Sequence, residues 1–135
     1  MTTVTETVTE AVASPLPGTL TQTLAGAQVQ IEWEGRWVPV CGAGELTPGR
    51  GVAAVLPDGR QVAVFLDRSG RTYAIGNRDP FTGAYVLSRG LLGSTGNDGR
   101  PFVASPLLKQ RFDLVNGRCL DDEAESVPVY PTRRR

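Results

Sequence analysis

The sequence contains no histidine among its 135 residues. This absence excludes Ser-His-Asp and Cys-His catalysis, histidine proton shuttles and every zinc site that requires an imidazole ligand. Only two cysteines are present, Cys41 and Cys119, and neither belongs to a Cys-x-x-Cys pair. A zinc ribbon or a thiolate-bound cluster cannot be assembled from this chain alone. We interpret both cysteines as buried, reduced thiols, with a disulfide as the alternative.

The chain also lacks an excess of charge and a long apolar run. Basic and acidic residues balance at 14 each, so no electrostatic footprint for nucleic acid is present. No apolar stretch approaches the length needed to cross a membrane. Residues 1–18 contain acidic but no basic residues and no apolar core, unlike a secretory signal. We therefore expect a cytoplasmic protein that binds neither nucleic acid nor membranes.

Glycine and proline are abundant and spread along the chain, at 16 and 10 residues. Long helical patterns are missing, which favours one all-β domain of short strands and tight turns. Residues 1–30 are rich in Thr and Ala and are interpreted as a flexible leader, part of which could instead dock on a partner. The folded domain is expected over residues 31–132, and residues 133–135 are expected to form a solvated basic tail.

Alternating apolar residues and turn signals predict an antiparallel meander in the middle of the chain. Its strands are expected at residues 51–56, 61–67 and 72–77. In the second strand both the even- and the odd-numbered residues from Val62 to Leu66 are apolar, which indicates a central strand covered on both faces. Further strands are expected at residues 37–41, 85–92, 101–106 and 126–131, the last on a sheet edge because of its prolines.

The glycines of "GSTGNDGR" (residues 93–100) have a GxxGxxG spacing that invites a nucleotide-binding interpretation. A dinucleotide loop needs a helix N-terminus directly after it, and Pro101 and Pro106 bracket a short strand there. We therefore predict a hairpin turn. The Asn116-Gly117 pair between two short apolar runs predicts a second hairpin.

Two loop-like stretches remain, "NRDPFTGAYVLSRG" from Asn77 and "VASPLLKQRFDL" from Val103. The Asn, Asp, Pro and two glycines of the first predict a loop held in one shape. The order of a meander, an N-R-x-P-x-x-G loop, a second loop ending in "RFDL" and then "GRCLD" resembles the Rieske ferredoxin domain over residues 32–130. The resemblance implies an antiparallel β-sandwich. In that family the first loop carries Cys-x-His and the second carries Cys-x-x-His, which together hold a [2Fe–2S] cluster.

All four cluster ligands are replaced in this chain. The cysteine positions hold Asp79 and Ser105, and the histidine positions hold Phe81 and Leu108. Phenyl and isobutyl groups cannot bind iron, and a serine hydroxyl is a poor substitute for a thiolate. We therefore expect no metal and no cofactor on this chain.

Other contacts must then connect the two loops. We expect Phe81 and Leu108 to pack between the loops, at about 1.5–3 kcal/mol each. Asp79 and Ser105 are expected to accept hydrogen bonds from loop backbone N–H groups.

A narrower resemblance concerns function. Four segments, "NRDPFTGAYVLSRG", "PFVASPLLKQRFDL", "GRCLDD" and "VPVYP", are similar in order to the small subunit of assimilatory NAD(P)H-dependent nitrite reductase. The resemblance implies docking on a large subunit that carries FAD, an iron–sulfur cluster and siroheme and reduces nitrite to ammonia. The resemblance also implies that the exposed loop tips form the interface, as an apolar surface with a polar rim. The expected docking residues are Arg78, Pro80, Phe81, Pro106, Leu107, Leu108, Lys109 and Arg111.

Two other functions compete with this hypothesis. A self-sufficient enzyme would need a catalytic pair, and Ser105 with Lys109 is the only suggestive one. The lysine stands four residues after the serine, however, whereas a Ser-x-x-Lys pair places it three residues on. The second alternative is a stand-alone, cluster-free Rieske-like interaction or regulatory module with a different partner.

Overall fold

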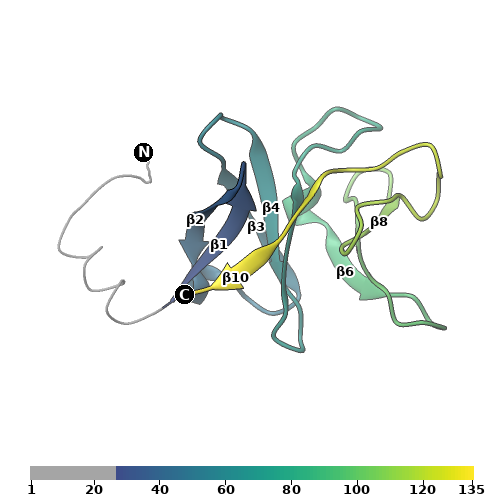
Figure 1. The fold of residues 1–135 in the computed structure, drawn as a ribbon. Helices are drawn as coiled ribbons and strands as arrows, with labels where there is room; N and C mark the ends of the chain where they lie inside the picture. Colours follow the sequence, from purple (N-terminus) through teal and green to yellow (C-terminus); the bar gives the residue numbers. More distant parts are fainter. Residues whose placement is uncertain (1–26) are drawn as a thin grey trace.

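The structure is a computed structural model that describes residues 27–135, and it contains three antiparallel β-sheets (Figure 1). The first sheet has the order β10 (Thr132–Arg134), β1 (Gln28–Trp33) and β2 (Arg36–Gly42). The second has the order β3 (Arg50–Val55), β4 (Gln61–Leu66), β5 (Thr72–Gly76) and β9 (Val129–Tyr130). The third has the order β6 (Leu91–Ser94), β7 (Pro101–Ala104) and β8 (Arg111–Asp113). Two short 3-10 helices, η1 (Ala43–Glu45) and η2 (Leu87–Arg89), complete the elements of the described residues.

The predicted all-β fold and the central meander are confirmed. Strand β4 pairs with β3 on one side and with β5 on the other, both antiparallel. Its residues Val62 to Phe65 are fully buried, because each face of the sheet carries its own hydrophobic cluster. Val62 and Val64 join the cluster that includes Val29 and Ile31 of the first sheet.

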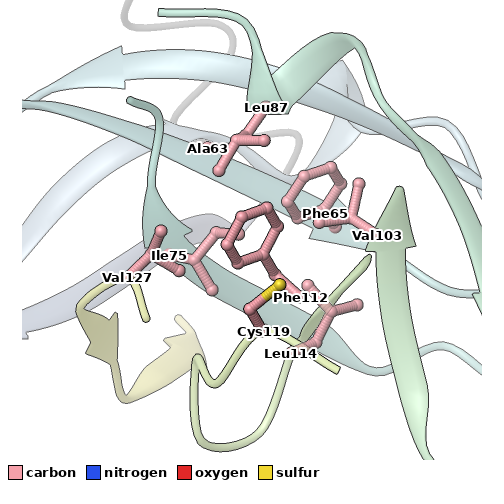
Figure 2. Close-up of a cluster of buried hydrophobic side chains, with 9 residues drawn as sticks. All are labelled: Ala63, Phe65, Ile75, Leu87, Val103, Phe112, Leu114, Cys119 and Val127. Atoms are coloured by element: carbon pink, nitrogen blue, oxygen red, sulfur yellow. The ribbon is translucent and has the colours of Figure 1, made fainter. Parts of the chain in front are cut away.

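The second cluster lies on the other face of the middle sheet, against the third sheet (Figure 2). Ala63 and Phe65 contribute from β4, and Phe112 of β8 lies at the centre of the group. This cluster supports the two loops resembling the Rieske loops, because the second loop leads directly into β8. The remaining members are Ile75, Leu87, Val103, Leu114, Cys119 and Val127.

Both expected hairpins are confirmed. Residues 95–100 connect β6 to β7, and Asn116-Gly117 lies in the turn that brings Phe112 and Cys119 into an antiparallel bridge. The predicted edge strand over residues 126–131 is confirmed only as the two-residue strand β9, which lies beside β5 at the sheet edge. Both cysteines are free thiols, with Cys119 buried and Cys41 half-buried.

The ends of the domain differ from the prediction. Strand β1 begins at Gln28, and β10 extends to Arg134, so the expected tail pairs with β1. The guanidinium of Arg133 lies 4.4 Å from the ring centroid of Trp37 and donates to Gln30 Oε1 at 2.7 Å. These contacts join residues about a hundred positions apart, which local sequence does not reveal. The predicted leader falls almost entirely on residues 1–26, outside the described part of the chain.

The strand expected over residues 85–92 is wrong for most of its length. The chain forms η2 at Leu87–Arg89, and only then enters β6 at Leu91. The side chain of Asn77 explains the departure, because its Oδ1 accepts the backbone N–H of Ser88 at 2.8 Å. No helix over residues 27–135 is long and apolar enough to cross a bilayer.

Candidate functional site

The first loop, residues 77–86, is anchored by Asn77 at the end of β5. Asn77 is 1% exposed and donates through Nδ2 to Gln61 Oε1 at 2.9 Å. Its backbone carbonyl accepts the N–H of Leu87 at 3.1 Å, in addition to the contact with Ser88. Asn77 therefore fixes both ends of the loop, through its side chain and through its backbone carbonyl. The sequence prediction of a shaped loop is confirmed.

Asp79 organises the middle of the first loop. Its carboxylate is fully buried, and Oδ1 accepts the backbone N–H of Phe81 at 2.8 Å. The backbone N–H of Asp79 donates to Ala84 at 2.8 Å, and its carbonyl accepts the N–H of Gly83 at 2.7 Å. Gly83 has a φ of 79°, a conformation that glycine adopts without steric cost.

The second loop, residues 105–110, repeats this geometry. The N–H of Ser105 donates to Gln110 at 2.9 Å, and its carbonyl accepts the N–H of Lys109 at 3.1 Å. Ser105 Oγ accepts the N–H of Leu107 at 3.3 Å, as Asp79 does for Phe81. The expectation that Asp79 and Ser105 accept hydrogen bonds from loop N–H groups is confirmed.

A direct hydrogen bond connects the two loops. Ser105 Oγ donates to Asp79 Oδ2 at 2.6 Å, and both residues are almost completely buried, at 1% and 0% exposed. This bond lies between the two positions that the sequence resemblance aligns with the Rieske cysteines. A hydroxyl that donates to a buried carboxylate forms one of the stronger hydrogen bonds in proteins. Sequence reasoning missed this contact, because the two residues are 26 positions apart.

The expected apolar connection between the loops is wrong in the case of Leu108. Leu108 is 55% exposed, so it does not pack between the loops. Phe81 is half-buried and packs on the core cluster, with its ring 6.2 Å from that of Phe112. The loops are therefore joined by a polar bond, while Phe81 attaches the first loop to the core below it.

These positions do not fit an iron–sulfur cluster. The carboxylate of Asp79 and the hydroxyl of Ser105 already bond to each other and to loop N–H groups. Phe81 and Leu108 offer no donor atom at the two histidine positions. Among residues 27–135, no group of three or more metal-ligating side chains lies together. The Ser105–Lys109 pair is equally unsuited to catalysis, since the buried hydroxyl is committed to Asp79.

Apart from Arg111, the expected docking residues divide into two environments, exposed and half-buried. Residues 106–109 and Arg78 are exposed, with Leu107 at 50%. Pro80 and Phe81 are half-buried. Arg78 and Pro80 also line an open groove of about 680 Å³ beside the first loop, together with Tyr85, Pro128, Tyr130 and neighbouring residues.

Arg111 differs from the others in having an internal partner. Its Nη2 lies 2.8 Å from Asp121 Oδ1, and its Cζ is 5.5 Å from the ring centroid of Phe102. Hydrogen bonding from Arg111 lowers the pKa of Asp121, and the same pair raises the pKa of Arg111. Arg111 therefore connects the start of β8 to the following segment instead of standing free at a rim.

The loop geometry is not confined to the two candidate loops. In four loops the first residue donates its N–H to the carbonyl five positions on and accepts the N–H four positions on. The fifth residue is left-handed in every case, with φ between 66° and 79°. The first residues are Asp79, Thr95, Ser105 and Asp113, and the fifth are Gly83, Gly99, Lys109 and Gly117.

Asp113 is a buried charge that sequence reasoning missed. It is 0% exposed and accepts the N–H of Val115 at 2.7 Å and Arg100 Nε at 2.6 Å. The sequence does contain a signal for this role, an Asp three residues before Asn116-Gly117. In such a pattern the carboxylate accepts hydrogen bonds from backbone N–H groups of the turn that follows it.

Comparison with known proteins now defines the class. Residues 36–135 match the family model described as "Rieske-like [2Fe-2S] domain". A crystal structure from Mycobacterium tuberculosis, assigned as an NADH-dependent nitrite reductase small subunit, superposes with a TM-score of 0.66. It is 48% identical, with 79% of this chain and 86% of that chain covered. The chain therefore has a Rieske-like fold.

Two relatives make the assignment narrower. The nitrite reductase (NADH) small subunit of Salmonella typhimurium is 46% identical over 99 residues, covering 73% of this chain and 89% of that protein. A nitrite reductase [NAD(P)H] large subunit from Klebsiella oxytoca is 41% identical over 98 residues, covering 72% of this chain but only 10% of the longer protein. This chain belongs to the nitrite reductase small-subunit family, part of an oxidoreductase holoenzyme.

Proposed function

We propose that this chain is the accessory small subunit of an assimilatory nitrite reductase and docks on a large subunit carrying FAD, an iron–sulfur cluster and siroheme. The observation that carries the proposal is the Klebsiella relative, in which a domain like this one occurs within a chain named as the large subunit. A domain found both separately and within the longer chain supports close physical association between the two parts.

The exposed second loop is the proposed centre of the interface. Pro106, Leu107 and Leu108 follow one another at the surface, with the two leucines at 50% and 55% exposed. Positive charge comes from Lys109 in the same loop and from exposed Arg78 in the first loop, next to Asp79, which bonds to Ser105. An apolar centre with charged residues around it is the usual composition of a specific protein interface.

The chain contributes structure to the complex and carries no electrons in this proposal. Electron transfer would need a redox centre, and the two loops present a hydrogen-bonded carboxylate and hydroxyl where the family's thiolates would be. Nitrite reduction to ammonia with NAD(P)H then takes place on the large subunit. Docking stabilises that subunit or shapes the flow of electrons or substrate within it.

Co-purification with the large subunit tests the proposal. The double variant L107D/L108D should abolish capture of the complex while leaving the melting temperature of the free chain unchanged, because both side chains are already exposed. Val115→Asp is the matched control, since Val115 is 61% exposed in the loop after β8, at the other end of that strand. The charge reversal R78E/K109E changes two positions outside the apolar centre, and it should weaken capture. Loss of capture by V115D alone, or none by the other two variants, would refute the proposed surface.

A further inference from the structure

Lys109 is the exception among the four loops of shared geometry. The other three have glycine at the left-handed fifth position, whereas Lys109 takes this conformation with φ at 66°. Side chains disfavour this region, because Cβ approaches the backbone carbonyl too closely. In each loop the fifth residue donates its backbone N–H to the carbonyl of the first residue. A glycine at position 109 would make the same hydrogen bond.

Glu34 is the other non-glycine residue with positive φ in the part of the chain described, and its conformation has a local cause. It precedes Gly35 in the two-residue connection between β1 and β2, with φ of 50° and 80°. Such hairpins require left-handed residues to match the twist of their strands. Lys109 has no such requirement, since it lies in a loop where glycine is used at every equivalent position.

Within residues 27–135, no side-chain hydrogen bond or ion pair of Lys109 offsets the strain. The Lys109 side chain is exposed, and no carboxylate of residues 27–135 lies within ion-pair distance of its ammonium group. By contrast, Arg60, Arg100 and Arg111 each pair with an aspartate. Strained backbone that packing does not explain is typical of functional positions.

The surroundings of Lys109 indicate what the side chain meets. Leu107 and Leu108, both at least half exposed, precede it in the same loop. The hydrogen bond from Ser105 to Asp79 holds the base of this loop against its neighbour. The loop thus presents one cation beside an apolar tip in a fixed position, which suits a carboxylate set in an apolar surface.

We propose that Lys109 is the specificity-determining residue of the docking surface and pairs with a carboxylate on the large subunit. This inference rests on the proposed function, and it names the residue and the partner chemistry. Position 109 favours glycine but holds lysine, because the fixed loop directs the ammonium group of Lys109 towards that carboxylate.

The test exchanges the residues at two equivalent loop positions, in the full chain titrated against the purified large subunit. Lys109→Gly should raise the dissociation constant about tenfold. It should also flatten the salt dependence of binding, while the melting temperature stays the same or rises. Gly99→Lys is the matched control, since a Cβ at Gly99 meets no atom within 4 Å and the loop lies at the opposite end of β7. This control should lower the melting temperature and leave the affinity unchanged.

The outcomes distinguish this inference from the proposed function. Absence of binding by the wild-type chain would refute the proposed function and this inference with it. Wild-type binding matched by Lys109→Gly would refute only the role of Lys109. A clear fall in the melting temperature of Lys109→Gly would also refute it, because the lysine would then serve the fold. Lys109→Arg should keep wild-type affinity, since it retains the charge.

Discussion

Ser105 donates a hydrogen bond of 2.6 Å to the buried carboxylate of Asp79 and thereby joins two loops that are 26 positions apart in the chain. The sequence resemblance aligns these two residues with the cysteine positions of the Rieske family. Each partner also accepts a backbone N–H of its own loop, at Phe81 and Leu107. A polar contact therefore holds the two loops together.

Removal of this bond should destabilise the fold. Ser105→Ala leaves Asp79 buried without its cross-loop partner, which costs about 1.5–3 kcal/mol for a bond to a charged group. The melting temperature should fall by roughly 10 °C in a domain of this size. Ser126→Ala, at an exposed serine, is the control and should melt like the wild type. An unchanged melting curve for Ser105→Ala would show that the cross-loop bond is not a structural link.

The two residues at the histidine positions should respond differently to truncation. Phe81→Ala removes a ring that packs on the core beside Phe112 and should lower the free energy of unfolding by about 2 kcal/mol, less than full burial would give. Leu108→Ala, at a side chain 55% exposed, should change it by less than about 0.5 kcal/mol. Chemical denaturation of both variants measures the difference. Equal losses would support the apolar connection that the sequence first predicted.

Acid should remove the contribution of the Arg111–Asp121 pair. Hydrogen bonding from Arg111 lowers the pKa of Asp121 in the folded state, so the pair stabilises the fold above the ordinary aspartate range and its contribution is lost as pH falls. The pair is partly exposed, so screening by solvent keeps its contribution small. Melting temperatures of wild type and Asp121→Asn should differ at neutral pH, and should converge as the pH falls from about 4 through the lowered pKa of folded Asp121. A difference that persists or grows in acid would contradict this assignment.

The cysteines should be unreactive while the protein is folded. Burial, reinforced by the charge of Glu45, raises the pKa of Cys41 to about 12, and Cys119 is 4% exposed in the core. Little thiolate is therefore present at neutral pH to react. Mass spectrometry after mild iodoacetamide treatment should find both thiols unmodified, and both alkylated after unfolding. Rapid modification of the folded protein would contradict this expectation.

The sequence was informative where local pattern decides structure. Apolar residues on both faces from Val62 to Phe65 correctly predicted the central strand. The Asn116-Gly117 pair correctly predicted the turn between Phe112 and Cys119. These features depend on side-chain alternation and turn chemistry, which are legible over a few residues. Asp79 and Gly83 likewise indicated a shaped loop, because each bonds to backbone groups only a few residues away.

Long-range contacts were not predictable in the same way. The bond between Ser105 and Asp79, the pairing of β10 with β1, and the stacking of Arg133 on Trp37 all join distant segments. The chain around η2 looked like a strand because it is apolar, yet Asn77 captures the backbone N–H of Ser88 and bends it. In each case a tertiary contact prevailed over the local pattern.

The absorption spectrum of the purified chain tests the central claim most directly. A small subunit whose loops are joined by Asp79 and Ser105 should show protein bands in the ultraviolet and none in the visible, with no stoichiometric iron. The same result is expected after expression with iron supplied and under anaerobic purification, since the ligands for a cluster are missing. Visible charge-transfer bands that bleach on reduction, together with bound iron, would contradict the account.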